Sequence, residues 1–242
     1  KDIRIAGAIE AAGSPAVGRD AGELAGINTL GVRISSETRE LLKGDVIINF
    51  SVHDVVPMHT ALAAANGKPM IIGATGLSPE ETQEVKKAAL KIPIVWTPNM
   101  SLGVNLLFSM VQKAAAILRP GYRIVVEETH HVHKKDAPSG TAIRLGEKVA
   151  EGLGKNYGNI AVHNPSAPDT EHANGKLVVI SHREGEVVGD HTVSFESEGE
   201  RIEFTHHAWN RDAFAIGALH AAKWIIGRKP GLYDMQDVLG LR

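Results

Sequence analysis

Short apolar runs alternate with amphipathic segments along the first half of the chain. Each apolar run stops at a polar residue or a glycine turn, as buried strands do, and strands are expected at 3–9, 46–50, 70–72 and 92–96. Helices are expected after three of these runs, at 53–66, 79–89 and 104–118. Residues 17–34 are interrupted by glycine and are expected to be irregular. The alternation predicts a parallel sheet with helices on both faces.

The pattern changes after Tyr122. A further strand is expected at 123–128 and an amphipathic helix at 141–153, and three later segments alternate apolar and polar residues at period two, at 176–182, 187–196 and 200–208. This pattern predicts a mixed or antiparallel sheet with one face toward solvent or a partner. A polar loop is expected at 156–175, and helices are expected at 213–226 and 233–239.

Ligands of parallel α/β sheets bind beyond the carboxyl ends of the strands. Those ends are expected at Glu10, Phe50–Ser51, 73–76 and 98–100, where glycines allow a close backbone approach. Glu10 has the position of an acid that holds a ribose diol, although an ordinary strand-end acid explains it more simply on its own. Taken together, the four ends favour a nucleotide crevice.

Composition narrows the class of protein. The 242 residues carry a net charge of -2, with 43% hydrophobic and 22% charged residues and no apolar run of the ~20 residues that a membrane helix needs. Neither nucleic acid nor a membrane is an expected partner. The absence of cysteine excludes disulfides and cysteine-zinc sites and fits a reducing cytoplasm. Twelve histidines, several of them clustered, favour acid-base or metal chemistry.

The clustered histidines lie in residues 128–142, with two lysines just before a predicted helix start. The backbone N–H groups of Ser139, Gly140 and Thr141 are expected at the N-terminus of that helix, where an anion is stabilised. Histidine can donate a proton near neutral pH, and lysine can donate one or neutralise a carboxylate. An acid-base site for an anionic small molecule is therefore the favoured interpretation.

Three other interpretations of the same stretch remain open. His131 and His133 have a spacing that a metal could use, but only Glu127, Glu128 and Asp136 lie near enough in sequence to complete a ligand set. A phosphate or nucleic-acid patch would use the two lysines, yet a wider basic field is missing. A solvated basic loop without chemistry is the simplest alternative.

Residues 128–142 read E-T-H-H-V-H-K-K-D-A-P-S-G-T-A, which closely resembles the signature of the 4-hydroxy-tetrahydrodipicolinate reductase (dihydrodipicolinate reductase) family. Further segments resemble that family at 22–26, 72–76, 99–105, 188–193 and 231–239. The resemblance implies an NADH- or NADPH-dependent reductase of diaminopimelate and lysine biosynthesis. It implies a Rossmann-type domain at 1–101 and 211–242, and a mixed-sheet α+β domain at 102–210 that binds substrate and builds a homotetramer.

The resemblance also implies roles for individual residues. His130 is the expected proton donor and Lys134 the second catalytic residue, while His131, Lys134, Gly140 and Thr141 are expected to bind a dicarboxylate substrate. No metal is expected. The expected cofactor-binding residues are Glu10, Phe50, Ser51, Gly73, Thr75, Pro98, Met100 and Arg211.

The chain departs from the family pattern in four places. The family begins with a strand and a glycine-rich turn that cradles the pyrophosphate, so one strand-helix unit is expected to be missing upstream of Lys1, by omission and not by natural loss. Ala11 replaces a basic residue found in some relatives, which favours NADH. Ser51, Ala74 and Met100 replace the more usual Thr, Thr and Phe. The loop 164–175 lacks the usual arginine and glycine pattern. A non-catalytic dinucleotide- or dicarboxylate-binding protein is the alternative.

Overall fold

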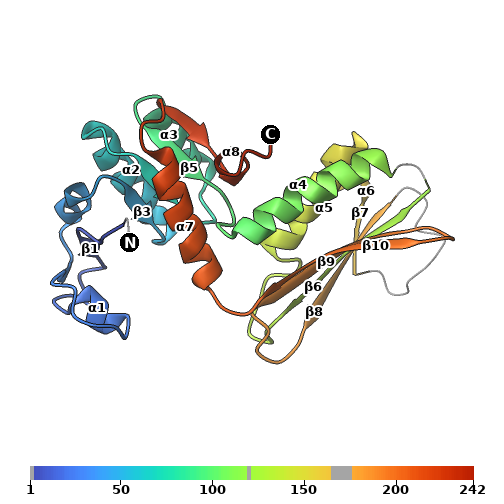
Figure 1. Cartoon of the computed structure of the whole chain (residues 1–242), viewed down its shortest axis with the longest axis horizontal. Helices are drawn as coiled ribbons and strands as arrows, with labels where there is room; N and C mark the ends of the chain where they lie inside the picture. Colours follow the sequence, from blue (N-terminus) through green and yellow to red (C-terminus); the bar gives the residue numbers. More distant parts are fainter. Residues whose placement is uncertain (1–2, 119–120, 165–175) are drawn as a thin grey trace. The chain divides into compact units, whose positions relative to one another are not determined.

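The computed structural model describes residues 3–118, 121–164 and 176–242, which divide into two compact units (Figure 1). Unit 1 comprises Lys1–Thr97 and Ala218–Val238, and unit 2 comprises Pro98–Gly217 and Leu239–Arg242. None of the helices in the described ranges has both the length and the hydropathy needed to cross a membrane.

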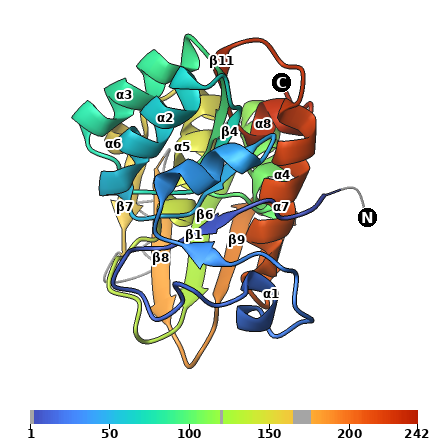
Figure 2. The same ribbon diagram turned by 90° about the vertical axis from the view of Figure 1, so that its left-hand side faces the viewer.

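Unit 1 is built on a four-stranded sheet in which every pair is parallel, in the order β11-β5-β4-β3. The strands are β3 (Ile47–Asn49), β4 (Met70–Ile72), β5 (Pro93–Trp96) and β11 (Gly231–Tyr233). Helices α2 (Val56–Ala65) and α3 (Pro79–Ala89) lie on one side of the sheet and α7 (Asp212–Ile225) on the other (Figures 1 and 2). The parallel sheet with helices on both faces is confirmed.

Helix α3 shows how local signals set the boundaries. Ser78 accepts a hydrogen bond from the Glu81 N–H while the Glu81 side chain accepts one from the Ser78 N–H, which forms a capping box. Pro79 at the first position and the acidic residues Glu80 and Glu81 in the first turn complement the helix dipole. The helix begins and ends at the residues that the sequence predicts.

The strand expected at 3–9 is much shorter than predicted. Only Ala8–Ile9 (β1) is a strand, and it pairs in parallel with Ile34–Ser35 (β2) in a separate two-stranded sheet. Ile3 and Ile5 are 44% and 51% exposed, so their alternation with polar residues marks no buried strand face. The segment expected to be irregular contains helix α1 (Ala21–Leu24) and is held by Asp20, whose carboxylate accepts backbone N–H groups from Gly22, Leu30 and Val32.

Unit 2 is a five-stranded mixed sheet in the order β10-β9-β6-β8-β7. Its strands are β6 (Arg123–His130), β7 (Ala161–His163), β8 (Leu177–Arg183), β9 (Gly189–Glu196) and β10 (Arg201–Ala208). Helices α4 (Leu102–Ile117) and α5 (Gly140–Leu153) cover one face (Figure 1). The core between sheet and helices includes Val126, Val179, Val193, Phe195 and Leu145.

Three further short elements were not predicted from the sequence. Helix α6 (Tyr157–Ile160) and strand β7 fall in the segment 156–175 that was expected to be a loop, because three or four residues between polar neighbours leave too little periodicity to detect. Strand β11 overlaps the helical tail expected at 233–239 only at Tyr233, and within that tail only Met235–Val238 (α8) is helical. Asn164 is the first residue of the divergent loop, and the rest of that loop, 165–175, lies outside the described residues.

Candidate active site

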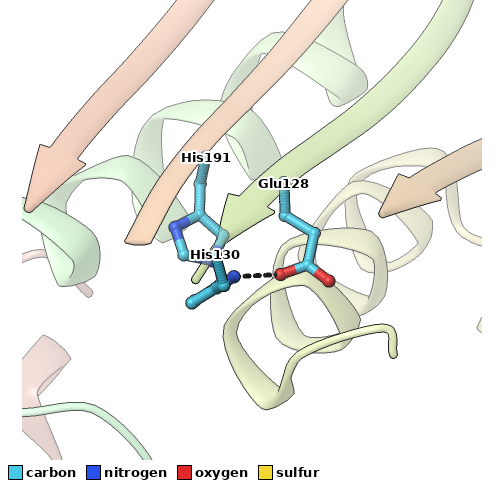
Figure 3. A group of neighbouring side chains, drawn as sticks. All are labelled: Glu128, His130 and His191. Atoms are coloured by element: carbon cyan, nitrogen blue, oxygen red, sulfur yellow. Dashed lines mark ion pairs between the residues drawn. The ribbon is translucent and has the colours of Figure 1, made fainter. Parts of the chain in front are cut away.

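The centre of the site lies at the carboxyl end of β6. Because strand side chains alternate between faces, Glu128 and His130 point to the same side as Val126, which is the side that α5 covers. Both are buried, with 1% of Glu128 and 8% of His130 exposed. The His130 Nδ1 and Glu128 Oε2 atoms are 2.5 Å apart and form an ion pair when the imidazole is protonated (Figure 3).

Glu128 has two further partners. Its Oε1 atom accepts a hydrogen bond from the Ser139 backbone N–H at 3.0 Å and lies 3.2 Å from Nη2 of Arg183. Burial alone would raise the pKa of Glu128, but the contacts from His130 and Ser139 outweigh it and hold that pKa well below its ordinary value. Glu128 is therefore a carboxylate at neutral pH.

His191 lies opposite Glu128 on the neighbouring strand β9. Its ring meets the His130 ring edge-on with centroids 5.1 Å apart, and its Nε2 is 3.3 Å from Oγ of Ser139 (Figure 3). Burial, followed by repulsion from His130, lowers the pKa of His191 to about 3. His191 is therefore a neutral imidazole beside His130.

The loop after β6 carries the expected second catalytic residue. The Nζ atom of Lys134 lies 2.8 Å from Oδ2 of Asp136, and this contact lowers the pKa of Asp136. Arg183, at the end of β8, donates to the backbone carbonyls of Lys134 and Asp136 and so ties the loop to the sheet. The N–H of His131 donates to the Val187 carbonyl, which fixes the first residue of the loop.

Helix α5 begins where the sequence predicts an anion site. Ser139 is the N-cap, and its Oγ accepts the Ala142 N–H at 3.1 Å. Within the described ranges, no protein acceptor is recorded for the backbone N–H groups of Gly140 and Thr141, which lie in the first turn. The Thr141 Oγ1 accepts from Asn99 Nδ2 at 3.2 Å, so its rotamer is fixed. Two free amides at the positive end of a helix are suited to a carboxylate.

Part of the expected cofactor set gathers at one edge of the sheet of unit 1. Phe50 and Ser51 follow β3, and Gly73 and Thr75 follow the adjacent strand β4. The Phe50 ring covers Gly73 so closely that a Cβ there would lie 2.3 Å from Cε1 of Phe50, and half of Phe50 stays exposed. Ser51 is fixed by its N–H bond to Oδ1 of Asn49 at 2.8 Å.

Glu10 follows β1 in the two-stranded sheet of unit 1, with an exposed side chain whose Oε1 accepts the N–H of Ala11. The other expected cofactor residues belong to unit 2. Pro98 and Arg211 are exposed there, whereas the side chain of Met100 is buried and only its backbone is available to a ligand. The Met100 carbonyl occupies the space where a Cβ on Gly217 would be, at 1.8 Å.

The sequence did not point to Arg183 or His191 as parts of the site, and it gave Glu128 no role beyond that of a nearby acid. Their signals were present but indirect, because Arg183 directly follows the strand expected at 176–182 and His191 lies inside the family-like segment 188–193. The ligand atoms of Glu128, His130 and His191 lie within 4.8 Å of one another, as in a metal site. A metal ion would have to share the Glu128 carboxylate with Arg183 and the Ser139 N–H, so the geometry favours a proton site over a metal site.

Comparison with known proteins finds related sequences over nearly the whole chain. Residues 1–100 match the family model described as dihydrodipicolinate reductase, N-terminus, and residues 103–239 match dihydrodipicolinate reductase, C-terminus. The 4-hydroxy-tetrahydrodipicolinate reductase of Anaeromyxobacter dehalogenans (strain 2CP-1) is 46% identical over 99% of this chain and 89% of its own. That of Syntrophotalea carbinolica is 45% identical over 99% of this chain and 90% of its own.

Among solved structures, a dipicolinate-bound dihydrodipicolinate reductase from Paenisporosarcina sp. TG-14 has a similar fold. It aligns with a TM-score of 0.70 at 24% identity and covers 90% of this chain and 86% of that one. A structure from Thermotoga maritima, described as a probable dehydrogenase, aligns with a TM-score of 0.51 at 13% identity, over 90% of this chain and 80% of that one.

Proposed function

The chain belongs to the dihydrodipicolinate reductase family, and from that premise we propose that it reduces 4-hydroxy-tetrahydrodipicolinate to tetrahydrodipicolinate with NADH or NADPH. The reaction belongs to diaminopimelate and lysine biosynthesis, and we assign it to the cytoplasm on the strength of that pathway. The non-catalytic binding protein is not favoured, because relatives at 45–46% identity over nearly the whole chain are named as reductases. The observation that carries the proposal is the buried His130–Glu128 pair, in which His130 stands four residues before Lys134 and close in sequence to a helix N-terminus with free amides.

The reaction adds a hydride and a proton to the substrate and removes its hydroxyl group as water. NAD(P)H, when bound, supplies the hydride. His130 supplies the proton, since Glu128 stabilises the protonated imidazole and burial keeps bulk water from it. Lys134 is the second group that quenches the developing negative charge on the substrate. Its contact with Asp136 holds the ammonium group within the loop until substrate carboxylate competes for it.

The substrate carries two carboxylates, and unit 2 offers cationic and amide donors for them. The backbone N–H groups of Gly140 and Thr141, with the Thr141 hydroxyl, bind one carboxylate at the positive end of α5. His131 and Lys134 bind the other, as a charge-assisted contact. This assignment agrees with the dipicolinate ligand named for the structurally similar reductase from Paenisporosarcina.

The carboxyl edge of the unit 1 sheet fits a dinucleotide. It presents an exposed aromatic ring at Phe50, which covers Gly73, together with the fixed Ser51 turn and the exposed Thr75, which suit an apolar ring and a polar contact. Pro98, Met100 and Arg211, the remaining residues expected to bind the cofactor, belong to unit 2.

NADH is the preferred cofactor in this proposal, because Glu10 would accept hydrogen bonds from a ribose diol but repel a 2′-phosphate. Ala11, next to it, offers no cation to offset that repulsion. The test is kcat/KM for NADH and NADPH in wild type and in Ala11→Arg. We expect NADH to be preferred in the wild type and the preference to fall in Ala11→Arg; a wild type that prefers NADPH contradicts the proposal.

Substitution of the two proposed proton donors tests the reaction. We expect His130→Ala to lower kcat by about a hundredfold or more with a modest change in KM, in line with the loss of a general acid. Lys134→Ala should lower kcat/KM more severely because it removes both a donor and a carboxylate contact. His133→Ala is the matched control, since the His133 side chain lies in the same loop and is 73% exposed.

Wild-type turnover in both His130→Ala and Lys134→Ala would refute these roles. A protein that binds NADH and dipicolinate in fluorescence titrations, yet oxidises no NADH with substrate in an absorbance assay, would instead be the binding module.

The sheet of unit 2 offers a surface for self-association, and we assign a homotetramer to it. The face opposite α4 and α5 carries paired polar side chains, with the Thr192 and Thr205 hydroxyls 3.1 Å apart and Asp190 3.1 Å from His207. Ile180 lies on the same face, is partly exposed and adds apolar area. Light scattering should give about 104 kDa, four times the 25.9 kDa of this chain. Thr192→Arg should lower that mass, and a wild-type monomer contradicts the assignment.

A further inference from the structure

A buried charge pair joins the separate parts of the proposed substrate site. Glu128 and Arg183 come from neighbouring parallel strands, and their Oε1 and Nη2 atoms are 3.2 Å apart. The Glu128 side chain has no solvent exposure and the Arg183 side chain is 21% exposed. Removing a carboxylate from water is costly unless it is paired and hydrogen-bonded, so a pair in this position calls for an explanation beyond stability.

Glu128 connects the end of β6 to the start of α5. One of its oxygens contacts Nδ1 of His130 at 2.5 Å, and the other accepts the backbone N–H of Ser139 at 3.0 Å. Ser139 caps the helix whose first turn carries the free amides of Gly140 and Thr141. A single carboxylate thus touches the proton donor and the residue that precedes the carboxylate-binding amides.

Arg183 connects the same carboxylate to the lysine loop. Its Nε donates to the Lys134 carbonyl at 3.3 Å, and its Nη2 donates to the Asp136 carbonyl as well as contacting Glu128. The planar guanidinium group can make these three contacts at once, whereas a lysine in its place would offer a single ammonium group on a flexible stem.

We propose that Glu128 and Arg183 are the positioning pair of the active site, with Glu128 orienting and charging His130 and Arg183 holding the backbone of the loop that carries Lys134. With Nδ1 directed at the carboxylate, Nε2 of His130 is the ring nitrogen left to donate the proton, and it lies over Gly189, where a Cβ would be only 2.9 Å away. This inference rests on the proposed role of His130 as the acid. The added claim is that His130 donates its proton efficiently only while the ionised Glu128 carboxylate contacts its Nδ1 atom.

The two residues should produce different kinetic signatures. Glu128→Gln keeps the shape and the acceptor for Ser139 but removes the charge behind the imidazole, so we expect kcat to fall on the order of tenfold to a hundredfold with little change in KM. The alkaline limb of the kcat profile should also move to lower pH, because the protonated imidazole loses its counter-charge. Other charged or titratable groups that face His130 are His191 on β9, Arg183 on β8 and Lys134 on the following loop, and this variant leaves all of them in place.

Arg183→Lys keeps the positive charge but loses the forked contacts with the loop. We expect a rise in substrate KM of about tenfold, with a smaller fall in kcat and an unchanged pH profile.

Glu127→Gln is the matched control for the Glu128 variants, because Glu127 is the neighbouring residue on the opposite face of β6 and is partly exposed. Arg123→Lys is the control for Arg183, because Arg123 forms an ion pair with Glu196 at the other end of β6.

The test is steady-state kinetics across pH on the full chain for these variants, beside their thermal melting temperatures. Glu128→Asp covers the case in which Glu128→Gln does not fold, since it keeps the charge but retracts it by one methylene; kcat should fall while the pH limb stays in place. A Glu128→Gln enzyme with a wild-type pH limb, or with losses that track only its melting temperature, overturns the proposal. Undiminished turnover in His130→Ala would instead refute the acid role itself, so the two failures are distinguishable.

Discussion

Replacing His191 with glutamine should make the protein less sensitive to mild acid. His191 is 4% exposed and lies between Ser139 and His130, and burial lowers its pKa from 6.5 to about 3. Below pH 6.5 the unfolded chain therefore binds a proton at His191, whereas the folded protein binds one there only as the pH approaches 3. Stability is fully present above pH 6.5 and falls as the pH drops toward 3. A glutamine in its place can still hydrogen-bond to Ser139 but does not titrate.

The size of the effect follows from the two pKa values. Each tenfold difference in proton affinity corresponds to about 1.36 kcal/mol, so full protonation of the unfolded state would cost the folded protein roughly 5 kcal/mol below pH 3. At pH 5 the loss relative to neutral pH is about 2 kcal/mol by the same relation. Burial lowers the pKa of His59 and His206 as well, and both are present in the wild type and in the variant, so their contributions cancel in the comparison.

Urea unfolding at about pH 7.5 and pH 5, followed by far-UV circular dichroism, measures this difference. With a slope of about 2 kcal/mol per molar urea, the midpoint of unit 2 should fall by roughly 1 M more in wild type than in His191→Gln. His182→Gln, an exposed histidine on β8, should behave like the wild type. Equal midpoint shifts in wild type and His191→Gln would mean that His191 is not held neutral by its surroundings.

Three further outcomes are expected. Gly189→Ala should lower kcat by about tenfold or more without unfolding the protein, because its Cβ would lie 2.9 Å from Nε2 of His130 and displace the ring; kcat and circular dichroism measured together check this. Gly152→Ala should lower the melting temperature despite the better helix propensity of alanine, since the added Cβ would lie 2.2 Å from the Gln112 carbonyl in α4, at a cost of about 1–3 kcal/mol. Dialysis against a chelator should leave turnover unchanged, and a loss restored by a divalent metal would favour the metal-site interpretation of the histidine cluster.

Elements with strong local signals were predictable from the sequence. Helix α3 carries its own cap at Ser78 and its own acidic first turn, and the strands of unit 2 alternate polarity at period two because one face packs on α4 and α5. The segment 3–9 alternates in the same way, yet only Ala8–Ile9 is a strand. Periodicity indicates which residues could be buried, but it does not indicate whether a partner strand is present along the whole segment. Short elements such as β7 and β11 depend on pairing with β8 and β5, which leaves no pattern within three residues.

Only the part of the candidate site that lies within residues 128–142 was predictable from the sequence. In sequence, His130, His131 and His133 form one cluster, but β6 ends at His130, whose side chain is buried, and the turn that follows leaves His131 half-buried and His133 exposed. The histidine that does face His130 is His191, brought there by the antiparallel register of β9 against β6.

The positive charge next to Glu128 belongs to Arg183, which lies 55 residues further along the chain. The parallel register of β8 against β6 brings the two residues together. Strand register is set by the packing of whole strand faces, so the spacing of residues within 128–142 cannot predict it. It follows that the residues that hold the chemistry in place are spread over three strands. A substitution that shifts the register of β8 or β9 by one residue would therefore remove Arg183 or His191 from the site while leaving every residue of the signature unchanged.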